Sequence, residues 1–303
     1  MSASAITLSS AREGMLSRVR DYVELTKPKI AVLVLLVVIA SGTVASWSQP
    51  DPLSLLHAVI GTLLVAGSAS AANQWIERSR DARMQRTANR PLPAGRLSPA
   101  EVAGFSAGCL ITGVLYLALT TNWPTTAWLV ISWILYVAVY TPLKPISAVN
   151  TAVGAVAGAL PALIGWSATG APLDQRALAL FLLIFLWQFP HFMAIAWLYR
   201  QDYSRAGHQM LPVVDPSGRR AGVQAVLAAL VLIPVSAVPA LHDPGLGGVA
   251  YVAVAALLGL AQLAISGWFL VRMNDASARL LLRASLVYLP VLMTLLMLIP
   301  FIK

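Results

Sequence analysis

The feature that most constrains this chain is a series of nine apolar runs, each about as long as a helix that crosses a bilayer. Backbone amides in lipid must be hydrogen-bonded within their own segment, and the runs lack the alternation of barrel strands. The sequence therefore predicts an all-α, polytopic membrane protein with nine transmembrane helices. The expected spans are 29–47, 53–72, 101–120, 125–141, 146–167, 177–198, 221–241, 247–271 and 280–302.

Composition excludes most soluble classes. Hydrophobic residues make up 58% of the 303 residues and charged residues only 11%, unlike a soluble globular domain. The net charge of +9 is no sign of a nucleic-acid partner, because the nine tryptophans lie mainly in or beside the spans, as interfacial anchors do. The single cysteine, Cys109, lies inside the third run and excludes a disulfide framework.

The basic residues predict the orientation. Nineteen of the 21 Lys and Arg fall in the N-terminal tail and in the loops that follow even-numbered spans, and only Arg176 and Lys303 fall on the opposite side. The positive-inside rule then places the N-terminus in the cytoplasm and the C-terminus across the membrane. We expect residues 1–24 to form a cytoplasmic tail, either a short interfacial helix or a loosely ordered segment, before a nine-span domain over 25–303.

Acidic side chains gather in the loop after the second span. Asn73, Glu77 and Asp81 lie one helical turn apart on one face if the second span continues as a helix into that loop. Ser98 and Glu101 then form a capping-box pattern at the start of the third span.

The loop after the sixth span carries a second acidic motif. Asp202 follows His191 by eleven residues, a net rotation of about 20° and a rise of about 16 Å on a continuous helix. We therefore expect both side chains to face one cavity. Pro190, directly before His191, is expected to bend the helix.

Carboxylates among clustered arginines are typical of a magnesium site completed by substrate phosphates. The alternative is that each acid is an ordinary loop charge balancing nearby arginines. Three acids from two loops four spans apart favour the magnesium interpretation for Glu77, Asp81 and Asp202 taken together.

At these loops the sequence resembles the intramembrane aromatic prenyltransferase superfamily, most closely its haem-farnesylating branch. The resemblance runs from about residue 25 to residue 212 and more diffusely beyond. It rests on four motifs: Asn73-x3-Glu77-Arg78-x2-Asp81-x2-Met84-x-Arg86-Thr87-x-Asn89-Arg90-Pro91, Tyr140-Thr141-Pro142-Leu143-Lys144, Trp187-Gln188-x-Pro190-His191-Phe192, and Asp202-Tyr203-x2-Ala206-Gly207-x2-Met210-Leu211-Pro212.

The resemblance implies a central cavity open to the cytoplasmic side of a bacterial cytoplasmic (inner) membrane. It also implies transfer of a farnesyl group from farnesyl diphosphate to a vinyl group of haem B, giving haem O with Mg²⁺ as cofactor. Farnesyl diphosphate, haem B and the lipid bilayer are then the partners, together with a haem-modifying or oxidase-assembly protein.

Site residues follow by position in the motifs. The expected metal ligands are Asn73, Glu77, Asp81 and Asp202, of which Glu77, Asp81 and Asp202 are also the expected catalytic residues. The expected diphosphate-binding residues are Arg78, Arg86, Arg90, Lys144 and Arg200. The expected haem-binding residues are His191, Trp187 and Gln188. His208, beside Gly207, is expected to be solvated.

Three positions depart from the family pattern. Ser79 and Glu77 stand where aspartate is common, and Pro145 stands where relatives carry further basic residues. Two rival functions stay open. One is a prenyltransferase of the same fold that acts on a quinone precursor or chlorophyllide. The other is a polytopic transporter, in which ionisable residues lie at the bilayer midplane.

Overall fold

The computed structural model describes residues 3–47, 51–241 and 245–299, with side chains from residue 14 onward. Within these ranges every regular element is helical, and nine segments are long and apolar enough to cross a membrane, as the sequence predicts. The spans are α2 (Pro28–Ala45), α3 (Pro52–Asp81), α4 (Pro99–Thr120), α5 (Trp123–Ile134) with π-helix η1 (Leu135–Tyr140) and α6 (Thr141–Leu143), α7 (Asn150–Ala168), α8 (Gln175–Leu198), α11 (Arg219–Ala237) with the 3-10 turn η2 (Val238–Ala240), α12 (Leu246–Arg272) and α13 (Asp275–Leu298).

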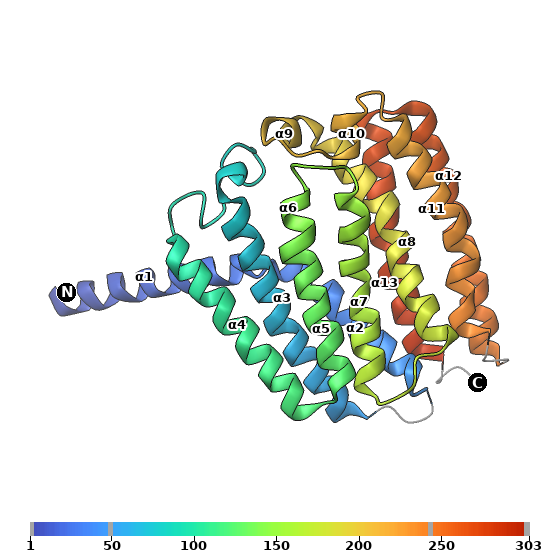
Figure 1. Ribbon diagram of the computed structural model, residues 1–303, viewed down its shortest axis with the longest axis horizontal. Coiled ribbons are helices and arrows are strands. Elements are labelled where there is room, and N and C mark those ends of the chain that lie inside the picture. Colours follow the sequence, from blue (N-terminus) through green and yellow to red (C-terminus); the bar gives the residue numbers. More distant parts are fainter. Residues whose placement is uncertain (1–2, 48–50, 242–244, 300–303) are drawn as a thin grey trace.

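Three shorter or peripheral helices complete the described chain: α1 (Ala3–Leu25), α9 (Arg200–Arg205) and α10 (Leu211–Val214). Figure 1 shows α1 running out sideways from the bundle, while α9 and α10 lie at the same end of the bundle as the connection from α3 to α4. The two loops that carry the acidic motifs are therefore at one end of the molecule.

Local signals explain where the spans begin. The predicted capping box at the start of α4 is confirmed, because the Ser98 hydroxyl accepts from the Glu101 amide at 3.3 Å and the Glu101 carboxylate accepts from the Ser98 amide at 2.8 Å. The fifth span begins at Asn150 rather than at 146, since residues 144–149 form turns. The Asn150 amide donates to the Ser147 and Gln209 carbonyls at 2.6 and 3.2 Å, which ties these turns to the loop after α9.

Small residues let the central spans approach closely. α7 has the largest buried share of the candidate spans. At Gly165 of α7, a Cβ would lie 2.0 Å from the Val38 carbonyl oxygen of α2, so the two backbones meet with no room for a side chain. Such contacts replace the hydrophobic driving force that is absent between helices in lipid.

Candidate active site

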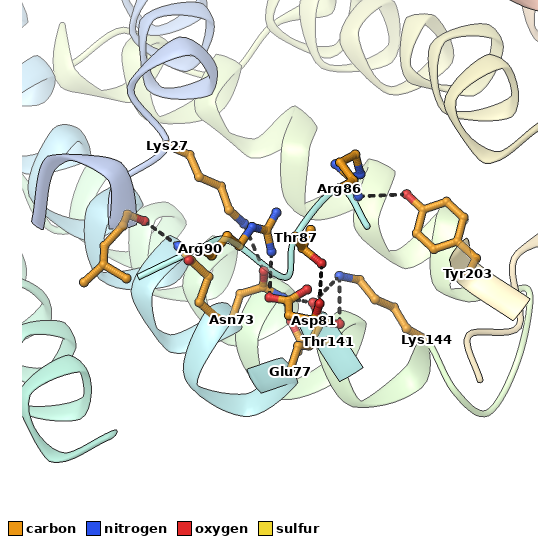
Figure 2. Close-up of polar contacts among 12 residues, drawn as sticks. Lys27, Asn73, Glu77, Asp81, Arg86, Thr87, Arg90, Thr141, Lys144 and Tyr203 are labelled. Carbon is orange, nitrogen blue, oxygen red and sulfur yellow. Dashed lines mark hydrogen bonds and ion pairs between the residues drawn. The ribbon is translucent and has the colours of Figure 1, made fainter. Parts of the chain in front are cut away.

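The acidic stripe predicted on the second span is confirmed. α3 continues to Asp81, and its 30 residues span about 45 Å, longer than the roughly 30 Å hydrocarbon core, so its last turns leave the apolar layer. Asn73, Glu77 and Asp81 are 2%, 4% and 1% exposed, and the Asn73 amide donates to Glu77 Oε2 at 2.9 Å. The three polar side chains face the interior of the bundle together (Figure 2).

Lys144 neutralises Glu77. Its Nζ lies 2.9 Å from Oε1 and 3.0 Å from Oε2 of Glu77, and 4.6 Å from the centre of the Tyr140 ring. Burial alone would lower the pKa of Lys144, but the Glu77 carboxylate raises it well above its ordinary value, so the ammonium stays charged. This is a buried ion pair between α3 and the residue that follows α6.

Asp81 is held on one side only. Its Oδ2 accepts from Arg90 Nη1 at 2.7 Å, and its backbone carbonyl accepts from the Thr87 hydroxyl at 2.8 Å. Oδ1 of Asp81 is buried and has no hydrogen-bond partner among the described residues. A buried carboxylate oxygen with an unused lone pair is costly unless something binds it.

The two acidic motifs are connected by Arg86 and Thr87, which contact Asp202 and Asp81 respectively. Asp202 is buried, pairs with Arg205 at 3.1 Å, and accepts from the Arg86 backbone amide at 3.4 Å, while the adjacent Thr87 contacts Asp81. The Arg86 guanidinium lies 4.9 Å from the centre of the Tyr199 ring and 3.5 Å from the Tyr203 hydroxyl, on the flank of the cluster (Figure 2). Loops four spans apart in sequence therefore contact each other here.

Lys27 belongs to this cluster, although motif reasoning did not select it. Its Nζ donates to Asn73 Oδ1 at 3.0 Å. The residue adopts a left-handed conformation, φ 51° and ψ 63°, which is unfavourable for a side chain other than glycine and recurs at functional sites. Burial, with further contributions from Arg90 and Lys144, lowers the pKa of Lys27 to about 7. A bound anion would favour its charged form. The sequence signal was a basic residue directly before the first span.

The expectation that His208 is solvated is wrong. Its side chain is 1% exposed and lies edge-on to the Tyr203 ring, 6.0 Å between centres. Gly207, at φ 72°, turns the chain back, and the Gln209 amide donates to the Lys144 carbonyl at 2.7 Å, which draws the loop inward. Burial lowers the pKa of His208 to about 4, so the imidazole is neutral at pH 7.

Two of the expected diphosphate-binding residues lie elsewhere. Arg78 is on the exposed side of α3, where its guanidinium donates to the Trp75 carbonyl at 2.7 Å and lies over the Trp75 ring. Arg200 pairs with Asp275 of α13 at 3.1 Å and lies over the Trp197 ring. Neither contacts the acidic side chains in this structure. Ser79, one of the departures, is exposed beside Arg78 and off the acidic face.

The expected single helix from His191 to Asp202 is wrong. α8 ends at Leu198 and Tyr199 is non-helical, so Asp202 lies on the separate helix α9 and the inferred rotation does not apply. The reason is local: the Tyr199 backbone, at φ −108° and ψ 20°, breaks the helical path.

His191, Trp187 and Gln188 have protein partners. Trp187 Nε1 donates to the Ser285 carbonyl at 2.7 Å, Gln188 donates to the Ala155 carbonyl at 2.8 Å, and His191 stacks on Trp187 with 5.0 Å between ring centres.

The contact of His191 with Ser285 assigns its tautomer. His191 Nδ1 lies 2.9 Å from the Ser285 hydroxyl, whose one proton is donated to the Leu282 carbonyl at 2.7 Å. The proton between His191 and Ser285 therefore resides on His191 Nδ1, and Nε2 carries the lone pair.

The oxygen donors of Asn73, Glu77, Asp81 and Asp202 are of the type that a hard cation such as Mg²⁺ prefers, but they do not surround a common point in this structure. Among the residues that the structure describes, no three His, Cys, Asp or Glu side chains form a group that could hold a metal ion. Each carboxylate is instead paired with a basic side chain. The unpartnered Oδ1 of Asp81, the Asn73 amide oxygen and the nearby cations are nevertheless the groups that a magnesium–diphosphate complex would use.

Comparisons with known proteins agree with one another. Residues 33–295 match the model of the UbiA prenyltransferase family. A protein of Solibacter usitatus named protoheme IX farnesyltransferase is 42% identical over 295 residues, covering 92% of this chain and 98% of its own.

Solved structures agree in fold. A digeranylgeranylglyceryl phosphate synthase structure has a TM-score of 0.74 at 18% identity, covering 94% of this chain and 97% of its own. A UbiA homologue from Archaeoglobus fulgidus bound to GPP and Mg²⁺ has a TM-score of 0.67 at 18% identity, covering 91% of this chain and 99% of its own.

Proposed function

Because the chain belongs to the UbiA prenyltransferase family, we propose that it transfers the farnesyl group of farnesyl diphosphate to a vinyl group of haem B, forming haem O. The observation that carries this proposal is the convergence of Asn73, Glu77 and Asp81, all buried, with the basic side chains of Lys27, Lys144 and Arg90 in one cluster. Paired acids and cations at this density suit an anionic leaving group. Relatives that are 42% and 40% identical to this chain are named protoheme IX farnesyltransferase.

The reaction balances as haem B, farnesyl diphosphate and water giving haem O and diphosphate. The bond between farnesyl C1 and oxygen breaks, and both electrons leave with diphosphate. The terminal vinyl carbon of haem bonds to C1, and water adds to the resulting cation beside the porphyrin with loss of a proton. Magnesium, when bound, would neutralise charge on the leaving diphosphate.

The residues of this chain supply the rest of that neutralisation. Lys27, Lys144 and Arg90 are held by ion pairs and hydrogen bonds before any substrate arrives, so they need no reorganisation when charge develops. Arg86 adds a fourth basic residue next to Asp202, which accepts from its backbone amide. The metal would be held by Asn73, Glu77, Asp81 and Asp202. The rings of Tyr140 and Tyr136, whose centres are 5.3 Å apart, offer faces for an allylic cation beside Lys144.

Transport is the weaker alternative. The acidic side chains cluster at one end of the spans, whereas a transport pathway places ionisable residues near the midplane.

The test is to incubate purified protein with haem B, farnesyl diphosphate and magnesium. We expect a mass gain on the porphyrin equal to one farnesyl group and one hydroxyl group. Prenylation of a hydroxybenzoate or of chlorophyllide in parallel reactions, with haem unchanged, would instead assign a different acceptor.

The nine apolar helices and the family place the protein in a membrane as a multi-pass protein. We propose that the acidic cluster lies on the cytoplasmic side of a bacterial inner membrane, where a central cavity opens. α1 then lies along that surface, since Met15, Leu16 and Val19 are 63%, 57% and 55% exposed. The farnesyl chain of haem O is apolar and keeps the product in the bilayer, so a haem-modifying or oxidase-assembly partner would collect it there.

The orientation predicts a pattern of reporter activity. Alkaline phosphatase is active only outside the cytoplasm, so fusions after Ala88 or Gln209 should be silent, and fusions after Asn122 or Gly170 should be active. A cytoplasmic reporter such as a fluorescent protein at the same positions should give the complementary pattern. Phosphatase activity after Ala88 would reverse the topology and place the acidic cluster on the outer side.

The role of His191 is tested by haem binding. If Nε2 of His191 ligates the haem iron, His191→Ala should weaken haem binding about tenfold or more and shift the Soret band, while affinity for a non-hydrolysable farnesyl diphosphate analogue is retained. Gln201→Ala, at an exposed position on α9, is the control. An unchanged Soret band with a lower melting temperature would show that His191 only supports packing through Ser285. The iron ligand would then be sought elsewhere, with His208 next.

A further inference from the structure

A groove separate from the acidic cluster runs along the outside of the bundle. It lies between the start of α7, the middle of α8 and the first half of α11, and its volume is about 880 Å³. Its walls are largely apolar, formed by residues such as Ala152, Phe189, Ala228 and Val231. Nothing in the prenyl-transfer proposal uses these side chains.

The open side of the groove faces the surroundings of the spans. Val149, Leu227 and Val231 line it and are 59%, 57% and 48% exposed. Residues of α11 with this exposure contact hydrocarbon when the helix crosses a bilayer, so the groove is filled from the lipid phase rather than from water.

One end of the groove is basic. Arg219 and Arg220 line it beside Asp215 and Ser217, at the end of the bundle where α9 and α10 lie. Both arginines are exposed, and neither guanidinium forms an ion pair within the described part of the chain.

Asp215 does not cancel the two arginines. Its Oδ1 accepts from the Ser217 hydroxyl at 2.6 Å, and its Oδ2 accepts from the Arg220 backbone amide at 2.9 Å. Two guanidinium groups against one engaged carboxylate leave a net positive charge at the mouth of the groove.

The dimensions match a lipid. From Arg220 to Val231 is eleven residues of helix, about 16 Å, so a charged head at the arginines leaves an acyl chain lying in the apolar walls. Basic pockets between transmembrane helices on the cytoplasmic side recognise anionic headgroups. We propose that this groove binds an anionic phospholipid, with the phosphate at Arg219 and Arg220 and one acyl chain along Leu227 and Val231.

The experiment measures the melting temperature of the full chain in neutral detergent with added phosphatidylglycerol or phosphatidylcholine of matched acyl chains. We expect phosphatidylglycerol to raise the melting temperature by roughly 3 °C or more above phosphatidylcholine. Arg219→Gln/Arg220→Gln should abolish that difference. The matched control is Arg272→Gln/Arg283→Gln, which removes two exposed charges elsewhere and should keep the difference.

Native mass spectrometry supplies a second readout that does not depend on stability. The wild-type protein should retain one phosphatidylglycerol, and the Arg219→Gln/Arg220→Gln variant should lose it. The proposal is overturned if both double variants respond alike, since the effect is then one of general surface charge. It is also overturned if farnesyl diphosphate or haem, rather than the lipid, gives the shift that depends on Arg219 and Arg220.

Discussion

Asp81→Asn and Asp202→Asn should each reduce prenyl transfer by about 100-fold or more while the protein stays folded in the membrane. Asparagine keeps the shape of each side chain but removes the charge on which metal binding depends. Asp81 has a buried carboxylate oxygen, Oδ1, with no hydrogen-bond partner among the described residues, and Asp202 contacts the same loop through the Arg86 amide. The measurement is turnover of farnesyl diphosphate and haem B at saturating and at limiting magnesium.

Measuring turnover over a series of magnesium concentrations distinguishes metal ligands from residues that do not bind the metal. Loss of a ligand should raise the magnesium concentration needed for half-maximal rate as well as lowering the maximum. Asp174→Asn is a suitable control, since Asp174 caps the start of α8 at the far end of that span from α9 and keeps capping as asparagine. Near-normal turnover of Asp81→Asn at limiting magnesium would remove Asp81 from the ligand set, and the same holds for Asp202.

Lys144→Met should lower both activity and stability. It leaves Glu77, only 4% exposed, as a buried carboxylate without its counter-ion, and such breakage typically costs about 3–5 kcal/mol. Activity should fall as well, because Lys144 is one of three cations that face the proposed diphosphate position. Melting temperature in detergent and turnover under saturating substrate measure the two effects separately.

A double variant distinguishes the two roles of Lys144. Glu77→Gln/Lys144→Met removes both buried charges, so most of the stability should return. Activity should not return, because both the expected ligand and the diphosphate cation are gone. Recovery of activity along with stability would mean that the pair is structural. Lys29→Met, an exposed charge two residues from Lys27, is the control for loss of one positive charge.

Much of the site could be predicted from the sequence because its residues follow local patterns. The stripe of Asn73, Glu77 and Asp81 depends only on the 3.6-residue helical period and on the second span continuing as a helix beyond its apolar residues. The structure confirms both conditions. By resemblance, Lys144 was expected only as a diphosphate-binding residue, and its pairing with Glu77 was not predicted. Its physical cause is that a carboxylate this deeply buried needs a counter-ion within reach.

The predictions that the structure contradicts concern places where the backbone changes direction. The interruption at Tyr199 separates His191 from Asp202, and the left-handed turn at Gly207 brings His208 inside. The assignment of Arg78 and Arg200 to diphosphate stays a prediction. In this structure Arg78 contacts Trp75, and Arg200 contacts Asp275 and Trp197. Spacing along the chain says nothing of such competing partners.

By itself, the sequence determined the membrane class, the nine spans and the two acidic loops, because hydrocarbon imposes length and polarity on every segment independently of its neighbours. Only the tertiary structure decided which charges meet. Lys27 reaches Asn73 across 46 positions, and Asp202 reaches the Arg86 amide across 116. Such contacts depend on how the helices pack and where each helix ends, and those are properties of the whole bundle rather than of any one segment.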